Sequence, residues 1–269
     1  MAGASVATDA ATETVVPTSE EDAIAEFGDG AGVVVVAGGT IVVPDLTYRR
    51  IQPTRALMLG HAGLAGIETD GSQVTIGAMT PVQDLVDLTA PLGPCAANVA
   101  DLEIRSQGTV GGNLCAGDAP EAPRGDLQGA FLALGATVRV AADGEVAEKP
   151  LEDFLGNHAG RLVLSVSFEE PEAGAFAGLD RPHTHDYTAL AVSGAKGKDG
   201  TLRLAVTGAG SWGARLPSAE AAAGDPESAG KAALGDVAPR DDALASAWYR
   251  TKVLPVLVRR VLTEMEASE

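Results

Sequence analysis

The sequence of 269 residues contains little cysteine, and this scarcity excludes several kinds of site. Its two cysteines are Cys95 and Cys115. Two thiols cannot by themselves ligate an iron–sulfur cluster or a four-cysteine zinc site. The sequence also shows no secretory leader and no apolar run long enough to cross a bilayer. These absences favour a reduced, cytoplasmic protein with no membrane span.

Basic residues are scarce as well. Nineteen Lys and Arg stand against 37 Asp and Glu, which gives a formal net charge of −18. Such a charge repels nucleic-acid phosphates and anionic membrane surfaces, so neither is expected as a partner. Apolar residues, in contrast, make up 45% of the chain, enough at this length for a substantial core.

Strand and helix patterns alternate along the first half of the chain. Thr18 and Glu21 have capping-box spacing and Gly28 is a stop signal, so a helix is expected between them. The β-branched run Val33–Val36 predicts a strand covered on both faces. A further strand is expected around residues 73–77.

The next helices and strands follow from caps and from apolar spacing. Thr80, Pro81 and Gln83 have the pattern of a capped helix start. A helix beginning near Asp126 and strands at 136–142 and 162–169 complete this part.

The C-terminal part begins after a stretch rich in Gly and Pro at 172–182, which is typical of a domain boundary. Strand patterns follow at 187–195 and 201–208, and then two short helical pieces. The last helix carries an apolar stripe with a proline that should kink it. The stripe comprises Leu244, Ala247, Trp248, Thr251, Pro255, Val258, Leu262 and Met265.

Two glycine loops are the motifs that best suggest chemistry. The first, "AGGTI" at 37–41, interrupts an apolar run, and the second, "TVGGN" at 109–113, repeats the theme. Glycine leaves room for backbone N–H groups to approach a diphosphate, and clustered amides bind anions without a lysine. Arg105 is the cation near the second loop. The alternative is that each loop is an ordinary tight turn.

Two other motifs carry less weight. The segment "GAGSWG" at 208–213 has the spacing of a dinucleotide-binding turn, but Pro217 follows closely and too few residues remain for a doubly wound domain. His183, His185 and Asp186 imitate a metal cluster without a further ligand at a supporting spacing. No metal site is therefore expected in this chain.

The order of several segments resembles the FAD-binding medium subunit of molybdenum hydroxylases of the xanthine dehydrogenase and carbon monoxide dehydrogenase type. The resemblance spans about residues 15–266. Its segments are "VVVVAGGTIVVPDLTYRR", "GSQVTIGAMTPVQDL", "IRSQGTVGGNLCAGDAP", "DYTALAV" and "DDALASAWYRTKVLPVLVRRVL".

The resemblance implies an α/β (α+β) fold, with a two-lobed FAD-binding domain of the molybdopterin-dehydrogenase (PCMH-like) type and a smaller C-terminal α/β domain. On this basis residues 1–14 form a disordered tail, 15–175 the FAD-binding domain and 180–269 the C-terminal domain. The two lobes are expected to divide near 55–65.

The same resemblance implies which residues bind FAD. They are Ala37, Gly38, Gly39, Thr40, Ile41, Ile104, Thr109, Val110, Gly111, Gly112, Asn113, Asp126, Val163 and Tyr187. Asp126 would lie near the ribityl or ribose hydroxyls, although its position also suits a helix N-cap. Tyr187 would stack on the isoalloxazine ring, although it could equally be an ordinary strand tyrosine.

The implied function is electron transfer within a complex. FAD on this chain would take electrons from the clusters of a two-cluster iron–sulfur small subunit and pass them to an external acceptor. A molybdopterin-binding large subunit would oxidise the substrate. The sequence leaves two alternatives open, a stand-alone FAD-dependent oxidoreductase of the same fold and a flavin-free scaffold subunit.

Overall fold

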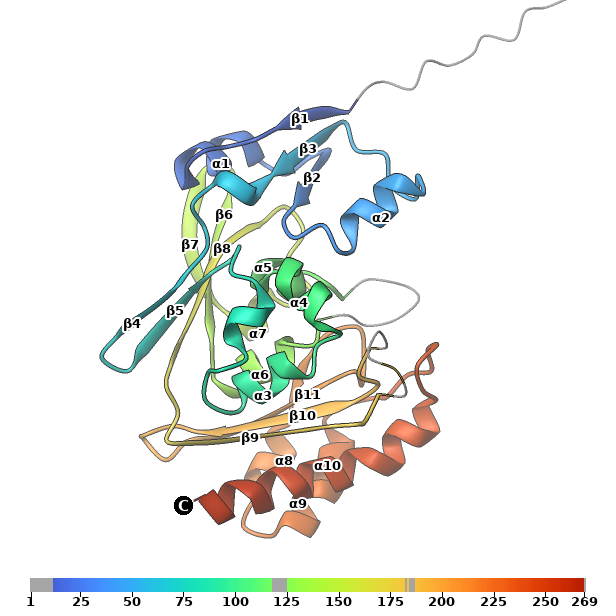
Figure 1. Ribbon diagram of the computed structural model, residues 1–269. Coiled ribbons are helices and arrows are strands. Elements are labelled where there is room, and N and C mark those ends of the chain that lie inside the picture. The colour runs from blue at the N-terminus through green and yellow to red at the C-terminus, as the bar shows by residue number, and fades with distance from the viewer. Residues whose placement is uncertain (1–11, 118–124, 182, 184–186, 269) are drawn as a thin grey trace, which may run out of the picture.

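A computed structural model describes residues 12–117, 125–181, 183 and 187–268, which contain three β-sheets stacked along the molecule (Figure 1). The strands are β1 Glu13–Val15, β2 Val33–Val36, β3 Arg55–Met58, β4 Ile67–Asp70, β5 Gln73–Gly77, β6 Thr137–Ala142, β7 Glu145–Pro150, β8 Leu162–Glu169, β9 Ala173–Gly178, β10 Ala191–Lys196, β11 Leu202–Thr207 and β12 Ala214–Arg215. The α-helices are α1 Glu20–Phe27, α2 Val42–Thr47, α3 Leu92–Ala97, α4 Leu102–Gln107, α5 Val110–Leu114, α6 Gln128–Ala133, α7 Leu151–Phe154, α8 Pro217–Ala221, α9 Pro226–Ala232 and α10 Ala247–Ser268. Short 3₁₀ helices lie at η1 Leu59–His61, η2 Val82–Leu85 and η3 Ala233–Gly235.

The first sheet is parallel, in the order β1-β3-β2, with α1 and α2 in its connections. The predicted helix after residue 18 is present, but its cap is Ser19, whose hydroxyl accepts a hydrogen bond from the Asp22 N–H. The expectation that Thr18 caps the helix is wrong, because the Thr18 hydroxyl instead bonds the Asp22 carboxylate. Gly28 ends the helix at a φ of +58°.

Strand β2 forms where the valine run predicted it, but it is not covered on both faces. Only Val36 is buried, while the other three valines are half-buried. The reason is that β2 is an edge strand of its sheet and Val35 faces a cavity. The β-branched run therefore reflects strand propensity rather than complete burial.

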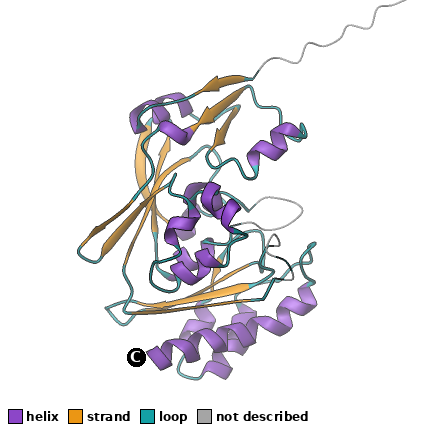
Figure 2. Cartoon of the chain, in the orientation of Figure 1, coloured by secondary structure: helices purple, strands orange, loops and turns teal. Residues whose placement is uncertain are grey.

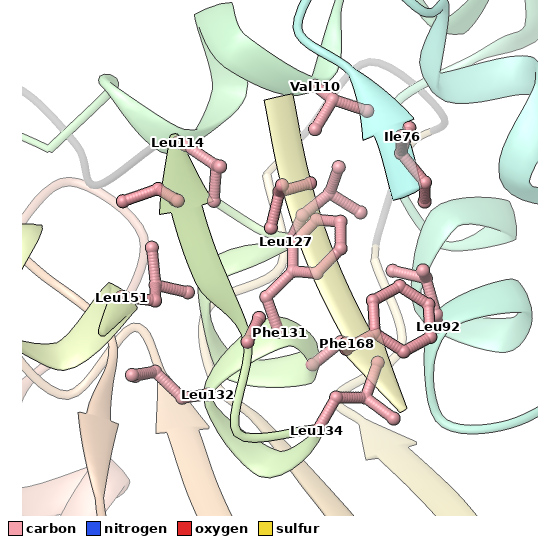
Figure 3. Packing of buried hydrophobic residues seen from close by; sticks show 14 of the residues in the cluster. Ile76, Leu92, Val110, Leu114, Leu127, Phe131, Leu132, Leu134, Leu151 and Phe168 are labelled. Carbon is pink, nitrogen blue, oxygen red and sulfur yellow. The ribbon is translucent and has the colours of Figure 1, made fainter. Parts of the chain in front are cut away.

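The second sheet is antiparallel, in the order β4-β5-β8-β6-β7, and the chain crosses to it between Met58 and Ile67. The helices between β5 and β6 pack on it around a core that includes Ile76, Leu127, Phe131 and Phe168 (Figure 3). Among the described residues, parallel strands joined through helices occur in the first sheet, whereas the second sheet is antiparallel. The fold is therefore of the mixed α/β class.

The capped helix expected at residue 80 is wrong in its details. Residues 82–85 form the 3₁₀ helix η2, and no side chain caps it. The Thr80 hydroxyl instead bonds the N–H and the C=O of Gly66. Gln83 accepts a hydrogen bond from Arg105. The two side chains of the expected capping box, Thr80 and Gln83, therefore bond residues distant in sequence instead of each other's backbone.

The third sheet is antiparallel, in the order β12-β11-β10-β9, and α8, α9 and α10 cover one of its faces (Figures 1 and 2). The stretch 172–182, expected to be a loose boundary, contains β9. The chain therefore changes sheets between Glu169 and Ala173. Strand β10 begins at Ala191, so Tyr187 lies in the connection before it, and the reading of Tyr187 as a strand residue is wrong.

Helix α10 buries only part of the expected stripe: Leu244 precedes the helix, and Ala247, Thr251 and Pro255 are half-buried. Leu254, Val258, Leu262 and Met265 are buried against the third sheet, and Pro255 lies inside the helix. Trp248, expected in the stripe, is 69% exposed. No helix in the described part of the chain is long and apolar enough to cross a membrane.

Candidate functional site

Most of the predicted site residues line one cavity of about 240 Å³, formed by the loop after β2, the segments between β5 and β6, and the connection before β10. They are Ala37, Gly38, Gly39, Thr40, Ile41, Ile104, Thr109, Gly112, Asn113, Asp126 and Tyr187. A second cavity of about 190 Å³ has Gly111 and Val163 in its lining. The two cavities share the wall formed by Val35, Ala37, Ile41, Val42 and Gly112. The first glycine loop therefore lies between two adjoining spaces.

The first glycine loop offers unused backbone donors. Among the described residues, none accepts a hydrogen bond from the N–H groups of Gly38, Gly39, Thr40 and Ile41. Gly39 has a φ of +74°, a conformation that favours glycine. Consecutive free amides at a cavity wall can bind an anion such as a diphosphate.

The two glycine loops touch through their backbones. A Cβ atom on Gly38 would lie 1.8 Å from the carbonyl oxygen of Gln107 and 3.0 Å from the Cα of Gly108. No side chain fits between these atoms, so glycine is needed for the loops to approach each other. The interruption of the apolar run at residue 38 therefore has a structural cause.

Most amides of the second glycine loop already have acceptors within the fold. The N–H of Val110 donates to Thr80, that of Gly111 to Ala78, and that of Gly112 to the Thr109 hydroxyl. The free amide donors at the site thus come from the first loop, and the second supplies a fixed wall.

Val110 is the predicted site residue that the structure does not bring to either cavity. Its side chain is fully buried in the core of the second sheet (Figure 3), and its N–H is bonded to the Thr80 carbonyl. The first turn of α5 directs this side chain to the core rather than to the cavities.

Arg105 is not an anion-binding cation. Its guanidinium donates to Gln83 and to the carbonyls of Ala97, Val99 and Ala100, at 2.9–3.3 Å. Val99 and Ala100 line the first cavity, and the sequence analysis missed both. Arg105 therefore shapes the cavity by holding these carbonyls.

Asp126 is a half-buried carboxyl group on the cavity wall. It precedes α6, whose cap position is Leu127 with no side-chain cap bond, so the expectation that Asp126 caps this helix is wrong. Burial raises the pKa of Asp126 to about 7, and the charge of Arg181 partly opposes this effect. The adjacent Leu127 N–H is bonded to Asn113, at 2.9 Å, which ties the second loop to this segment.

Tyr187 lines the first cavity from the connection between β9 and β10. The residue after it, Thr188, is bonded through its hydroxyl to the Asn98 side chain, at 2.6 Å. Ala189 accepts a hydrogen bond from the buried guanidinium of Arg250. The connection that carries Tyr187 is thus anchored both to the segment after α3 and to α10.

The two thiols have no acid–base role in this arrangement. Burial raises the pKa of Cys115 to about 12 and that of Cys95 well above its ordinary value, the latter with a further contribution from the charge of Asp126. Both thiols are therefore neutral at physiological pH. Cys115 lines the second cavity as a small apolar filler.

The "GAGSWG" segment packs against α6 and His158. The Gly213 N–H donates to the buried Gln128, and the Trp212 ring lies 4.9 Å from that of His158. No cluster of three metal-ligating side chains occurs within the described ranges, and His185 and Asp186 lie outside them.

Residues 10–168, more than half of the chain, match the family described as "FAD binding domain in molybdopterin dehydrogenase". The alpha subunit of the 6-hydroxypseudooxynicotine dehydrogenase complex of Paenarthrobacter nicotinovorans is 29% identical, with 93% of each chain covered. The carbon monoxide dehydrogenase medium chain of Afipia carboxidovorans is also 29% identical, covering 93% of this chain and 95% of that one.

A solved structure supports the same relationship. The Cu,Mo-CO dehydrogenase in its cyanide-inactivated form contains a chain that is 26% identical, with a TM-score of 0.85, covering 96% of this chain and 98% of that chain. The chain described above therefore belongs to the family of FAD-binding domains of molybdopterin dehydrogenases, an oxidoreductase family, and its cofactor is FAD.

Proposed function

We propose that FAD binds across the two adjoining cavities, with its diphosphate on the first glycine loop between them. The observation that carries this assignment is the set of amides at residues 38–41, which have no acceptor among the described residues and line the first cavity, with Ile41 also in the wall shared with the second. A Cβ on Gly38 would meet the backbone of Gln107, so the loop can take its place at the cavity only with glycine there. The residues present thus fit a long, bent cofactor with an anionic centre.

The side chains around the cavities suit the two ends of FAD. Tyr187, Asp126 and Asn113 surround the first cavity, where an aromatic ring can stack on the isoalloxazine and a carboxylate can accept bonds from ribityl hydroxyls. Val163, Met79 and other apolar groups surround the second, which suits the adenine. When bound, FAD supplies the redox chemistry, and the chain supplies binding, orientation and electrostatics.

The proposed role is electron transfer in a multi-subunit molybdenum hydroxylase. In this role the chain takes electrons from an iron–sulfur small subunit and passes them to an external acceptor. A molybdopterin-binding large subunit oxidises the substrate. Similarity over nearly the full length to chains named as medium subunits supports this role. The two cysteines support it too, since they are too few to ligate the clusters.

The isolated chain provides the test. Expressed alone, it should retain FAD and be reduced by an artificial donor such as dithionite, yet oxidise no organic substrate of the complex. Flavin absorbance and steady-state turnover measure the two properties. Turnover of such a substrate by the chain alone would show a stand-alone flavoenzyme, and a chain that binds no FAD would refute the cofactor site.

A further inference from the structure

One wall of the first cavity is held from the C-terminal domain. The wall is the segment 97–100, which follows α3, and Val99 and Ala100 of this segment line the cavity. Ala100 has a φ of +38°, which an alanine rarely adopts and which surrounding contacts must maintain.

Two hydrogen bonds cross from the C-terminal domain to this wall, one on each side of Val99. The Arg181 guanidinium donates to the carbonyl oxygen of Ala100, at 3.0 Å. The Asn98 side-chain amide donates to the Thr188 hydroxyl, at 2.6 Å. Thr188 is 6% exposed, so its bond is shielded from water. We call these two bonds the clasp.

The clasp is separate from the support that the wall receives from its own domain. Arg105, which lies in α4, bonds the carbonyls of Ala97, Val99 and Ala100. The Ala100 carbonyl therefore accepts from two guanidiniums, one from each domain. Loss of the clasp should leave the wall bonded to Arg105 but free to move away from the C-terminal domain.

Arg181 also acts on the carboxyl group across the cavity. Among the residues that the structure describes, the titratable groups around Asp126 include the cationic Arg181, the neutral thiol of Cys95, which donates to the Asp126 carbonyl at 3.3 Å, and Tyr187, which lines the same cavity. The positive charge of Arg181 favours the ionised form of Asp126 against the effect of burial.

We propose that Arg181 and Thr188 are positioning residues through which the C-terminal domain holds the cofactor in the cavity. They fix the 97–100 wall, and Arg181 also keeps the Asp126 carboxylate available to cofactor hydroxyls. This inference rests on the proposed cofactor site. It adds that release of FAD is controlled by a bond between domains, at residues that need not touch the flavin.

The test measures the rate of FAD release and its pH dependence in the full-length chain. Arg181→Met and Thr188→Val each remove one bond of the clasp. Arg181→Lys and Thr188→Ser keep the charge and the hydroxyl. Arg259→Met and Thr263→Val, on the exposed face of α10, are matched controls for the loss of a cation and of a hydroxyl.

Arg181→Met and Thr188→Val should each accelerate FAD release about tenfold, because each removes one of the two bonds that hold the 97–100 wall to the C-terminal domain. The controls should release FAD at the wild-type rate. Thr188→Ser should restore slow release. If Arg181→Met does not fold, Arg181→Gln provides the same comparison.

The pH profile separates a charge effect from a structural one. FAD binding that needs the Asp126 carboxylate weakens as the pH falls through the pKa of about 7. Without Arg181 that carboxyl stays protonated to higher pH, so the midpoint of FAD loss should move to higher pH in Arg181→Met. It should stay near the wild-type value in Arg181→Lys and Thr188→Val.

Two results would overturn the inference. Release at the wild-type rate in both Arg181→Met and Thr188→Val would refute the clasp, and an unchanged midpoint in Arg181→Met would refute the charge effect. Failure of the cofactor site itself would be seen differently, as a wild-type chain that never contains FAD.

Discussion

Asp126 is a carboxyl group whose ionisation depends strongly on the fold. Its pKa rises from an ordinary 3.8 to about 7 because it is buried, so the folded chain binds a proton more tightly than the unfolded chain. Its contribution to stability is therefore present below pH 4 and is lost as the pH rises through about 7. A carboxylate kept at this cost at a cavity wall is typical of a binding function.

Asp126→Asn should accordingly stabilise the flavin-free chain at alkaline pH. We expect the free energy of unfolding to rise by about 2–4 kcal/mol at pH 8.5, and the gain to shrink as the pH falls toward 4. Urea denaturation at several pH values measures this difference. A gain of the same size at every pH would show that ionisation of Asp126 is not its cause.

Tyr187 offers a second test at the residue scale. Tyr187→Ala should change the fluorescence and reduction potential of the flavin while leaving most FAD bound, because a stacking contact contributes only about 1 kcal/mol. Tyr187→Phe keeps the aromatic face and should stay close to the wild-type spectrum. If Tyr187→Ala leaves both fluorescence and potential unchanged, the ring does not stack on the flavin.

At the scale of elements, the approach of the two glycine loops is the feature that shapes the site. Gly38→Ala places a Cβ 1.8 Å from the Gln107 oxygen, so the loops must separate. We expect the variant to fold and to lose most of its FAD. Gly60→Ala is the matched control, because its Cβ would meet no atom within 4 Å.

Flavin content per folded chain, from absorbance after gel filtration, distinguishes the two variants. Full flavin occupancy in Gly38→Ala would mean that the close approach of the loops is not needed for binding.

Helix α10 begins at a buried ion pair that anchors the C-terminal domain. Arg250, 1% exposed, bonds both oxygens of Asp242 at 2.7–2.8 Å, and donates to the carbonyl of Ala189. The pKa of Asp242 lies below its ordinary value. Partial burial alone would raise it, but hydrogen bonds from Arg250 and from the Leu244 and Ala245 amides outweigh that effect. The pair thus stabilises the fold above the ordinary pKa, and its contribution is lost as the pH falls through the lowered pKa.

Asp242→Asn should destabilise the chain by about 3 kcal/mol at pH 7, because it leaves the Arg250 charge buried without its counter-ion. The variant should differ less from the wild type in acid, where the wild-type carboxyl is itself protonated. Denaturation at pH 7 and at a series of lower pH values, extending below the lowered pKa of Asp242, provides the comparison. A loss below 1 kcal/mol at pH 7 would assign the anchoring to the carbonyl bonds alone.

Over the whole molecule, local patterns predicted the elements better than the contacts between them. The valine run of β2 and the stop at Gly28 depend on neighbours in sequence, and both are present. The capping role expected of Thr80 was wrong because its partner, Gly66, approaches only in the folded chain, and the bonds of Arg105 to the carbonyls of the 97–100 segment could not be read from the sequence for the same reason.

At the site, too, local sequence patterns predicted some residues, while others depend on contacts formed only in the folded chain. The residues of the first glycine loop could be recognised from sequence, since glycine pairs after a strand have a limited set of uses. The cavity residues Val99 and Ala100 and the clasp at Thr188 carry no local signal. They follow from the packing of the C-terminal domain against the 97–100 wall.

The central claim is that this chain is the flavin-bearing subunit of a larger molybdenum hydroxylase, and native purification tests it most directly. A tagged copy expressed in the source organism should be recovered with two other polypeptides. The complex should contain molybdenum, iron and one FAD per copy of this chain, as measured by elemental analysis and flavin absorbance. Recovery of the chain as a free flavoprotein without molybdenum and iron would contradict the claim.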